Sequence, residues 1–175
     1  MLFTHTARPG ADGYDTAVTV VDLTTVTARS VTIAGYSTDY RVAADGTSFV
    51  VGMIDFDCTT GSVASYSLTA VNADATASAT EAFGGIPHGD MVLGPDGSVY
   101  QIVEMSDGDA VSTDVLVARP GSLDITRIGL DGYPQSDVRF GLDGTGYVTT
   151  GTIDVQDAAL RTVITVVAAA PTAHV

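Results

Sequence analysis

Short runs of alternating apolar and polar residues, separated by turn residues, recur along the whole chain. Before an Asp-Gly pair, apolar residues stand at every second position, as Met91 and Leu93 do, which is the period of a β-strand with one buried side. The segment "SVYQIV", residues 98–103, follows that pair and predicts the return strand of a hairpin. The one helical candidate, "VQDAALRTV" at residues 155–163, ends in β-branched residues and predicts a loop leading into a strand. The pattern therefore predicts an all-β chain.

This hairpin pattern is an internal repeat. Three segments align: "DYRVAADGTSFVV" from Asp39, "DMVLGPDGSVYQIV" from Asp90 and "DVRFGLDGTGYVTT" from Asp137. In each, the first Asp precedes a second Asp by six residues, and the second is followed by Gly, by Thr or Ser, and by an aromatic residue at its fourth position. The second Asp residues are separated by 51 positions (45 to 96) and 47 positions (96 to 143). Agreement at this many positions in three copies indicates a true repeat.

Each period of the repeat has room for four short antiparallel strands, which is the content of a β-propeller blade. The sequence therefore predicts one propeller domain over residues 1–175, partial in extent, with blade units at about 1–36, 37–86, 87–134 and 135–175. The first unit begins with the aromatic-bearing strand "LFTHT" and lacks its innermost strand, so the chain holds about 3.75 blades.

A count of fifteen strands does not close a ring easily, because propellers protect their sheet edges by radial repetition and closure. We therefore expect that the chain is part of a larger propeller with further blades in a longer chain, or that it assembles with another copy of itself.

The Asp-Gly-Thr/Ser-x-aromatic pattern resembles the repeats of the bacterial NHL, YVTN and SMP-30-like propeller families. The Thr- and Val-rich style, with "GPDGSVYQ" followed by "STDVLVA", is most similar to repeat segments of actinobacterial, mycobacterium-type surface or secreted proteins. The resemblance covers nearly the whole chain and implies a propeller in the extracellular space or the cell envelope. It carries no catalytic motif across. The N-terminal segment "MLFTHTARPG" has no basic region before a long apolar run, so no signal peptide is predicted.

Acidic residues dominate the charge of the chain. There are 21 Asp and Glu against seven basic residues, all of them Arg, which gives a net charge of −14. Nucleic acids and anionic lipid headgroups need a basic counterpart, so nucleic acid binding is excluded. No apolar segment is long enough to span a membrane, so insertion is not expected. A protein or glycan partner fits this surface, and cations would be attracted to it.

The first Asp of each repeat is the main candidate for chemistry. Six residues of strand would carry Asp39, Asp90 and Asp137 to the face opposite the Asp-Gly turns, where they would surround the mouth of a central channel. Carboxylate oxygens are ligands that Ca²⁺ prefers, so these three residues are the calcium candidates. The alternative is structural, because an Asp before a strand often accepts hydrogen bonds from loop N–H groups.

Further candidates lie in the loops of the same face. They are Asp55 and Asp57 in "DFDCTTG", Asp107 and Asp109 in "SDGDAVSTD", and His88 in "GIPHGD". The Asp spacing can point two carboxylates to one side, although neither loop matches the EF-hand pattern. The alternative for these residues is solvated surface charge, and for His88 an exposed loop histidine.

Two functions remain open. The first is a non-enzymatic propeller module that binds a protein or glycan or serves as a scaffold, with the acidic loop face as its interaction surface. The second is a calcium-dependent hydrolase or lactonase of the SMP-30-like kind that uses the channel-mouth carboxylates. Its weakness is that the acids are equivalent in every unit, whereas an enzyme site usually needs different residues from different blades.

Overall fold

The computed structural model of the chain describes residues 2–7, 13–57, 60, 62–108, 110–154 and 159–168. Every regular element in this part is a β-strand, and every strand pairing whose register is resolved there is antiparallel. The segment that begins at Ala159 is a strand and not a helix. The predicted all-β class is confirmed.

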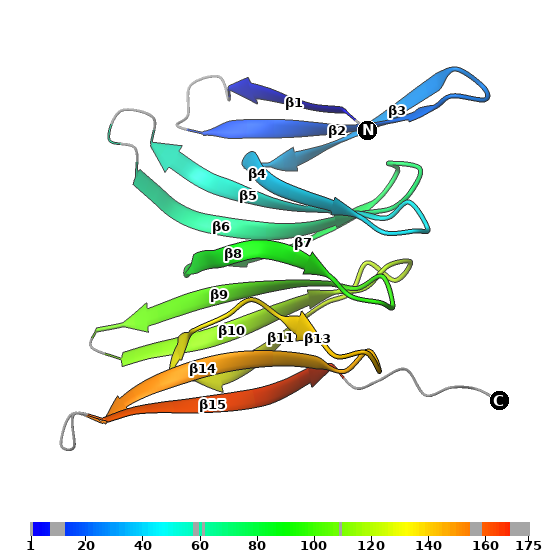
Figure 1. Cartoon of the computed structure of the whole chain (residues 1–175). Coiled ribbons are helices and arrows are strands. Elements are labelled where there is room, and N and C mark those ends of the chain that lie inside the picture. Colours follow the sequence, from blue (N-terminus) through cyan, green and yellow to red (C-terminus); the bar gives the residue numbers. More distant parts are fainter. Residues whose placement is uncertain are drawn as a thin grey trace. The chain divides into compact units, whose positions relative to one another are not determined.

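The chain divides into two compact units, which are described separately. The first comprises Met1–Gly84 and Ala118–Ile125 and holds two sheets. Its strands are β1 (Leu2–Ala7), β2 (Tyr14–Asp22), β3 (Thr27–Ala34), β4 (Tyr36–Val42), β5 (Ser48–Asp57), β6 (Ser62–Val71) and β7 (Ser78–Phe83). In each sheet the neighbours along the chain are also neighbours in space, giving the orders β1-β2-β3 and β4-β5-β6-β7 (Figure 1).

The second unit comprises Gly85–Val117 and Thr126–Val175 and also holds two sheets. Its strands are β8 (Ile86–Leu93), β9 (Val99–Asp107), β10 (Ala110–Ala118), β11 (Ile125–Asp131), β12 (Tyr133–Pro134), β13 (Arg139–Phe140), β14 (Gly146–Asp154) and β15 (Ala159–Ala168). One sheet has the order β8-β9-β10-β11. In the other, β12 and β13 both pair with one edge of β14, and β15 pairs with β14 as well.

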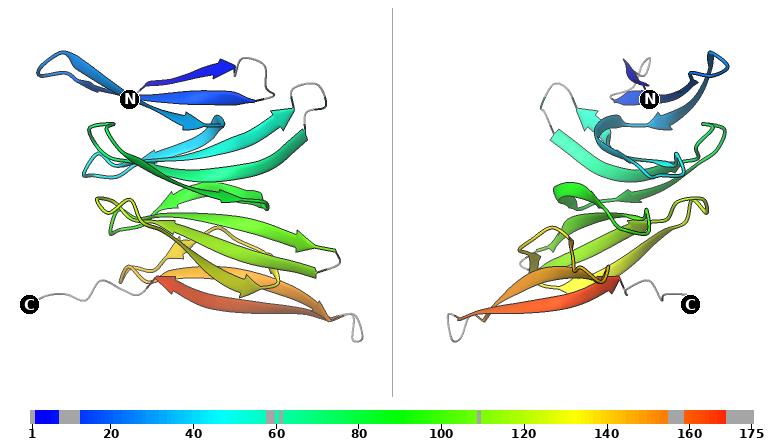
Figure 2. Two further views of the ribbon diagram at one scale, coloured as in Figure 1. Left: turned by 180° about the vertical axis from the view of Figure 1, so that it is seen from behind. Right: turned by 45° about the vertical axis from the view of Figure 1, so that its right-hand side comes forward.

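These four sheets match the predicted units in strand order and number, with one reservation. The first sheet has three strands and the second and third have four, as predicted, and the successive strands lie side by side in both views of Figure 2. In the last sheet the innermost strand is interrupted between β12 and β13. The fourth strand that the sequence predicts for this unit, "TAHV" at residues 172–175, lies outside the described residues. The predictions of a single domain and of blades arranged in a ring stay predictions.

The Asp-Gly pairs form the hairpin turns that the sequence predicts. In the third sheet, the Gly97 N–H donates to the Gly94 carbonyl (3.0 Å) and the Gly94 N–H donates to the Ser98 carbonyl (2.7 Å). Gly97 has a φ of 81°, in the left-handed region that favours glycine. This is the pattern of a type I turn followed by a glycine bulge, with Pro95 at the position where such turns favour proline. The same pair of bonds closes the turns at residues 43–47 and 141–145.

Each turn is held by its Asp side chain in the same way. Asp96 accepts the Ser98 N–H (3.0 Å) at one carboxylate oxygen and the Ser98 hydroxyl (2.9 Å) at the other. Asp45 binds Thr47, and Asp143 binds Thr145, with matching geometry. The Thr or Ser after each Gly is therefore part of the turn, because its hydroxyl and its N–H satisfy both oxygens of one carboxylate.

Small residues stand at the start of each turn, and in two of the three turns the residue is glycine. A Cβ at Gly94 would come within 2.9 Å of the Asp96 carboxylate and 2.9 Å of the Tyr100 ring. At Gly141 it would lie 2.8 Å from Asp143 Oδ1. At these two positions the turn carboxylate lies where a Cβ would stand, whereas the turn at residues 43–47 has Ala43, with a Cβ, at the same place.

A second glycine also recurs, although the predicted repeat did not include it. It joins each of the first three sheets to the strand that follows. A Cβ at Gly35 would lie 2.7 Å from the Met53 carbonyl oxygen. In the second unit, Cβ atoms at Gly85 and Gly132 would overlap the carbonyl oxygens of Glu104 and Gly151. All three carbonyls stand four residues after the repeat's aromatic residue. The glycine spacings of 50 (35 to 85) and 47 (85 to 132) residues show that the signal was present in the sequence.

Within each unit, one sheet packs on the next through opposite sides. We call the side of a sheet that carries the repeat's aromatic residue the aromatic face and the other side the back face. In the first unit, Val18 and Ile33 lie on the aromatic face of the β1–β3 sheet and pack against Val50 and Val71 on the back face of the β4–β7 sheet.

The second unit repeats this arrangement. Tyr100, Ile102, Val115 and Val117 of the β8–β11 sheet form a core with Val138 and Val148 of the β12–β15 sheet. The Tyr100 and Phe140 rings meet edge to face, with centroids 5.3 Å apart.

The alternation before the turns predicted buried apolar residues in the innermost strands, and this is only partly confirmed. Met91 and Val138 are buried, whereas Tyr40, Val42 and Leu93 are 53%, 42% and 41% exposed. The innermost strand forms the edge of its sheet, so its side chains have neighbours on one flank only.

Candidate functional site

The first Asp of each repeat lies where the innermost strand departs from regular pairing. In β4 the register shifts between Ser37 and Asp39, and in β8 it shifts between His88 and Val92. In the last sheet the residues between Pro134 and Arg139, which include Asp137, separate β12 from β13. Bulges of this kind bend a strand and re-aim its side chains, and they are common next to functional sites.

Polar side chains replace the missing ladder bonds at these bulges. The Thr38 hydroxyl donates to the Val51 carbonyl (3.3 Å), and the Ser136 hydroxyl accepts the Thr149 N–H (3.4 Å). These two pairs occupy equivalent positions in the repeat. In the β8–β11 sheet, Gly89 stands in place of the hydroxyl residue. There the buried Gln101 amide donates to the His88 carbonyl (3.4 Å) and the Ile102 carbonyl (2.8 Å). Sequence reasoning missed Gln101, although the other two copies of the repeat have Val50 and Val148 at this position.

Asp39 is held by a neighbouring cation. Its carboxylate forms an ion pair with Arg41 and accepts the Tyr40 N–H (2.7 Å). The Asp39 and Arg41 side chains are both about a quarter to a third exposed (25% and 32%). Because this carboxylate is already neutralised, Asp39 is a poorer calcium candidate than the repeat alone indicates.

Asp137 has a different environment. Its Oδ1 occupies the space where a side chain at Gly89 would stand, so the carboxylate lies against the backbone of β8. Gly89 has a φ of 64°, which favours glycine. Asp137 is therefore placed next to the residue that precedes Asp90, and the pair belongs to one unit. Sequence reasoning did not single out Gly89, whose neighbours in the alignment are Thr38 and Ser136.

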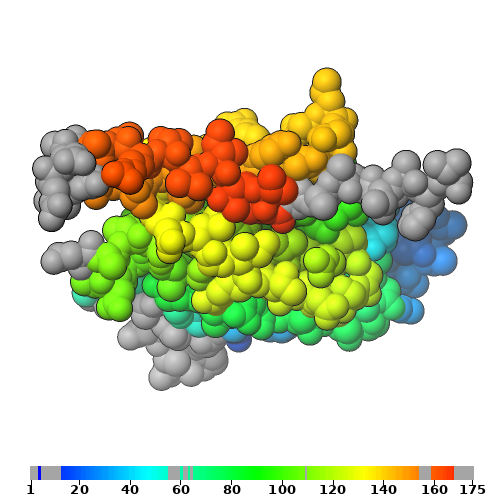
Figure 3. Space-filling model, turned by 90° about the horizontal axis from the view of Figure 1, so that it is seen from below, coloured from blue at the N-terminus to red at the C-terminus, as the bar shows by residue number. Residues whose placement is uncertain are grey.

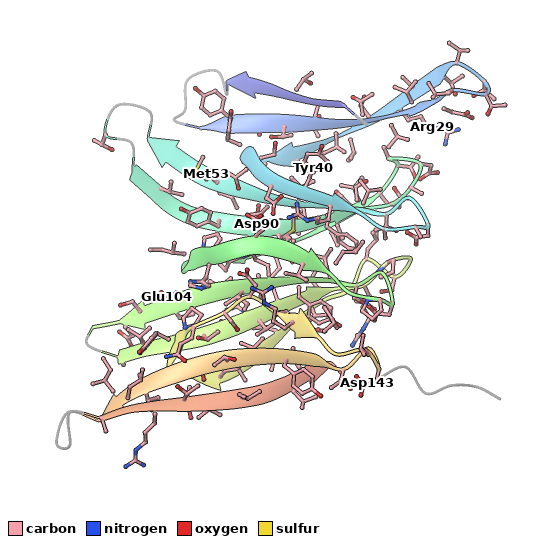
Figure 4. The ribbon with its side chains drawn as sticks, in the orientation of Figure 1. Arg29, Tyr40, Met53, Asp90, Glu104 and Asp143 are labelled. Atoms are coloured by element: carbon pink, nitrogen blue, oxygen red, sulfur yellow. The ribbon has the colours of Figure 1, made fainter. Side chains whose placement is uncertain are left out.

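His88 lies inside a strand and not in the loop that the sequence predicted, and Asp90 lies within the same strand and not at its start. Both belong to β8, with His88 opposite Ile102 and Asp90 near the middle of the strand (Figure 4). His88 is half-buried and Asp90 is exposed. The strand begins as soon as the chain leaves Gly85, because that glycine must pack on the Glu104 carbonyl, and no loop is left to carry His88.

The loop acids fall at one end of each sheet. We call the end with the Asp-Gly turns the turn end and the opposite end the loop end. Asp107 is exposed in the last residue of β9, at the loop end of its sheet. Asp55 and Asp57 lie in the last residues of β5, although their side chains, like Asp109 as a whole, lie outside the described residues. In the second unit, Figure 4 shows Asp143 at the turn end and Glu104 toward the loop end.

The turn-end carboxylates are engaged in structure, and this lowers the pKa of three of them. The Thr145 N–H and hydroxyl hold the pKa of Asp143 below its usual value. The Thr25 hydroxyl, with the N–H groups of Thr24 and Thr25, lowers the pKa of Asp22, and the Thr76 hydroxyl lowers that of Asp74. Hydrogen bonds to the charged form favour ionisation. These contacts give the Asp residues of the turns a structural role.

Two open clefts lie elsewhere. One of about 480 Å³ lies in the first unit between the β2–β3 turn and the β6–β7 turn, where Arg29 and Asp74 form an exposed ion pair (3.4 Å). The other, about 300 Å³, lies in the second unit between β11 and the back face of β14 and β15, with Asp131 on its wall. Neither brings together the predicted site residues.

The residues that the structure describes contain no group of three or more His, Cys, Asp or Glu side chains that could hold a metal ion. Within the same residues, no helix has the length and apolar character needed to cross a membrane. Comparison with known proteins found no matching family model and no matching curated protein.

Proposed function

We propose that the chain is a β-propeller segment that serves as a binding or scaffold module and not as an enzyme. Support for the propeller comes from the four-stranded up-and-down sheets and from the packing of aromatic face on back face within each unit. That mode of packing can be repeated from one sheet to the next, which is what a ring of blades requires.

The contrast between the two ends of a sheet carries the functional part of the proposal. At the turn end, both carboxylate oxygens of Asp45, Asp96 and Asp143 accept hydrogen bonds within their own turns. At the loop end, Asp107 and Asp131 are exposed. These two carboxylates are therefore available to a partner, and we propose that they bind a protein or glycan that offers cationic or hydroxyl groups, outside the cytoplasm.

The experiment compares equal charge changes at the two ends. The chain is tested against a glycan panel and an oligo-lysine peptide by interferometry, first unchanged and then as Asp107→Asn with Asp131→Asn. This double variant should weaken binding, whereas Asp22→Asn with Asp74→Asn, which removes the same charge at the turn end, should not. Equal weakening by both double variants, or no binding to any probe, would contradict a loop-end surface.

One observation favours the calcium-dependent hydrolase as a second candidate. Asp137 lies against Gly89, the residue before Asp90, so two carboxylate-bearing residues approach each other from neighbouring sheets of one unit. Thermal unfolding in EDTA and in millimolar Ca²⁺ separates the candidates, because a ligand of the folded state raises the midpoint. The binding-module proposal predicts no shift. A rise with Ca²⁺ that disappears in Asp137→Asn would establish the calcium site instead.

A further inference from the structure

The outermost strand of the β8–β11 sheet has a free edge in the part of the chain that the structure describes. The strand order is β8-β9-β10-β11, so β10 pairs with one edge of β11 and no described strand pairs with the other. The N–H groups and carbonyls of a free edge alternate along the strand, and another extended backbone matches their spacing. The chemistry of this edge therefore suits an added strand.

The register with β10 shows which residues of β11 face this free edge. The Arg119 N–H donates to the Asp124 carbonyl (3.1 Å), so these two residues form a hydrogen-bonded pair where the strands meet their turn. Bonded and non-bonded pairs alternate in an antiparallel sheet, so residues an odd number of positions after Asp124 direct their N–H and carbonyl outward. Gly129 and Asp131 are two of them. Asp114 Oδ1 lies 3.6 Å from the place of a Cβ on Gly129, which agrees with this register.

A cleft of about 300 Å³ borders β11 and shows where an added strand would lie. Residues 129–131 form one wall, and three Thr side chains and Val163 of β14 and β15 form the other. Figure 3 shows the yellow atoms of β11 beside the orange and red atoms of these two strands. Val163 stands opposite the buried Thr150, on the same side of the sheet, yet it is 49% exposed. A strand added to β11 would extend its sheet over Val163.

Contacts within the sheet do not explain the glycine at position 129. A Cβ on Gly129 would meet Asp114 Oδ1 at an ordinary contact distance of 3.6 Å, and the φ of Gly129 is outside the left-handed region. At Gly85 and Gly132, by contrast, a Cβ would overlap a backbone carbonyl. Glycine inside a strand costs stability and often marks a place where another backbone approaches closely. The position of Gly129 on the free edge indicates such an approach.

Two exposed charged residues near this edge determine the charge of the incoming strand. Asp131 ends β11, and Arg161 stands opposite Thr152 in the sheet on the far side of the cleft. Leu130 packs on the core shared with that sheet, so Asp131, one residue later, carries its side chain on the other side of β11. An added residue paired with Asp131 shares this side and points away from Arg161. A cationic side chain is favoured there, because opposite charges attract across a strand pair.

We propose that a protein partner adds an extended segment to the free edge of β11, antiparallel to it and over Val163. The segment has β-branched residues at alternate positions, facing β14 and β15, and a Lys or Arg opposite Asp131. This charged contact rests on the proposed loop-end binding, whereas the backbone pairing has a readout of its own. A second copy of the chain is a poorer occupant, because copies with a net charge of −14 repel each other.

The probe is the N-acetylated peptide Lys-Val-Thr-Val-Thr-Val with a fluorophore at its C-terminus, and its binding is measured by fluorescence anisotropy. With its Lys opposite Asp131, both Thr N–H groups point toward β11 and the Val N–H groups point away. One form of the peptide is N-methylated at both Thr residues, and the matched control is N-methylated at the first two Val residues.

Two variants of the chain test the position of the added strand. Val163→Asp places a charge beneath it, and Ile164→Asp adds the same charge on the other side of the same sheet. Both residues are exposed, at 49% and 68%, so each variant should fold, which circular dichroism checks.

The unmethylated peptide should bind the unchanged chain and Ile164→Asp equally. Methylation of the Thr nitrogens should raise the dissociation constant at least about tenfold, and methylation of the Val nitrogens no more than about twofold, because the first alone removes hydrogen bonds to β11. Val163→Asp should raise it at least about tenfold, since the added strand would bury the new carboxylate. Equal effects of the two methylations, or no binding of the unmethylated peptide, would overturn the proposal.

Oligo-lysine separates this inference from the proposed function. If oligo-lysine binds at the loop end and the peptide does not bind, strand addition fails and the loop-end proposal stands. If the peptide shows the expected methylation pattern and Asp107→Asn with Asp131→Asn leaves oligo-lysine binding unaltered, the loop-end proposal alone fails. Two-copy particles of the unchanged chain that the peptide splits would assign the edge to a second copy and overturn the proposed partner.

Discussion

The β8–β11 sheet and the β12–β15 sheet follow the same repeat but meet different surroundings. Both have the carboxylate-held turn, a linking glycine packed on a carbonyl, and an irregularity in the innermost strand. They differ on the aromatic face, where Tyr100 is 4% exposed and Tyr147 is 36% exposed. The local sequence thus builds the sheet, whereas burial of its aromatic face depends on what packs against it.

The largest expected effect concerns the two aromatic residues that differ in burial, Tyr100 and Tyr147. Tyr100→Ala should lower the free energy of unfolding by about 4 kcal/mol, because it removes a buried ring that contacts Phe140. Tyr147→Ala should cost no more than about 1 kcal/mol. Urea unfolding of the two variants gives both values. Equal losses would show that the two faces are alike.

The linking glycines should behave the same way in both sheets. Gly85→Ala and Gly132→Ala should each cost about 3 kcal/mol, because the new Cβ meets a backbone carbonyl that cannot move aside. Gly84→Ala is the matched control, since a Cβ there meets nothing within 4 Å. Thermal unfolding of the three variants checks this. A loss for Gly84→Ala as large as that for its neighbour would contradict the packing argument.

The turn carboxylate should contribute less. Asp96→Ala removes hydrogen bonds to the Ser98 N–H and hydroxyl and should cost about 1 kcal/mol. Asp107→Ala, at the exposed loop end, should leave the unfolding free energy unchanged. Chemical denaturation separates the two. A stability loss confined to Asp107→Ala would reverse the assigned roles of the two ends.

The smallest effect is a pH dependence at the turn end of the last sheet. The pKa of Asp143 lies below its usual value near 3.8 in the folded chain, so the folded state favours the charged carboxylate. Its stabilisation is complete above the unfolded pKa and is lost as the pH falls through the folded pKa. The unfolding midpoint of Asp143→Asn should therefore fall less steeply below about pH 4 than that of the unchanged chain. Identical pH profiles for Asp143→Asn and the unchanged chain would show that the Asp143 carboxylate does not contribute in this way.

Much of the fold was predictable because the repeat consists of turn residues and strand patterns that act over a few neighbouring positions. Asp96 and Gly97 mark a turn whose geometry needs both residues, and the strand pattern on either side fixes the hairpin. Gly85 could also have been found, since glycine recurs at that place in three units.

The rest depends on tertiary contacts that single positions do not encode. Nothing local distinguishes Tyr40, which is exposed, from Met91, its buried counterpart. The three first Asp residues are alike in the alignment, yet Asp39 pairs with Arg41 while Asp137 lies over Gly89. Their position within the irregular innermost strand could not be predicted either, because a bulge is set by how the strand fits its partner.

The binding of the two double variants tests the central functional claim, that the loop end is the interaction surface, most directly. Interferometry measures the dissociation constant of the oligo-lysine peptide for the unchanged chain and for each double variant. The account predicts weaker binding for Asp107→Asn with Asp131→Asn and unchanged binding for Asp22→Asn with Asp74→Asn. Equal weakening by both double variants would contradict it.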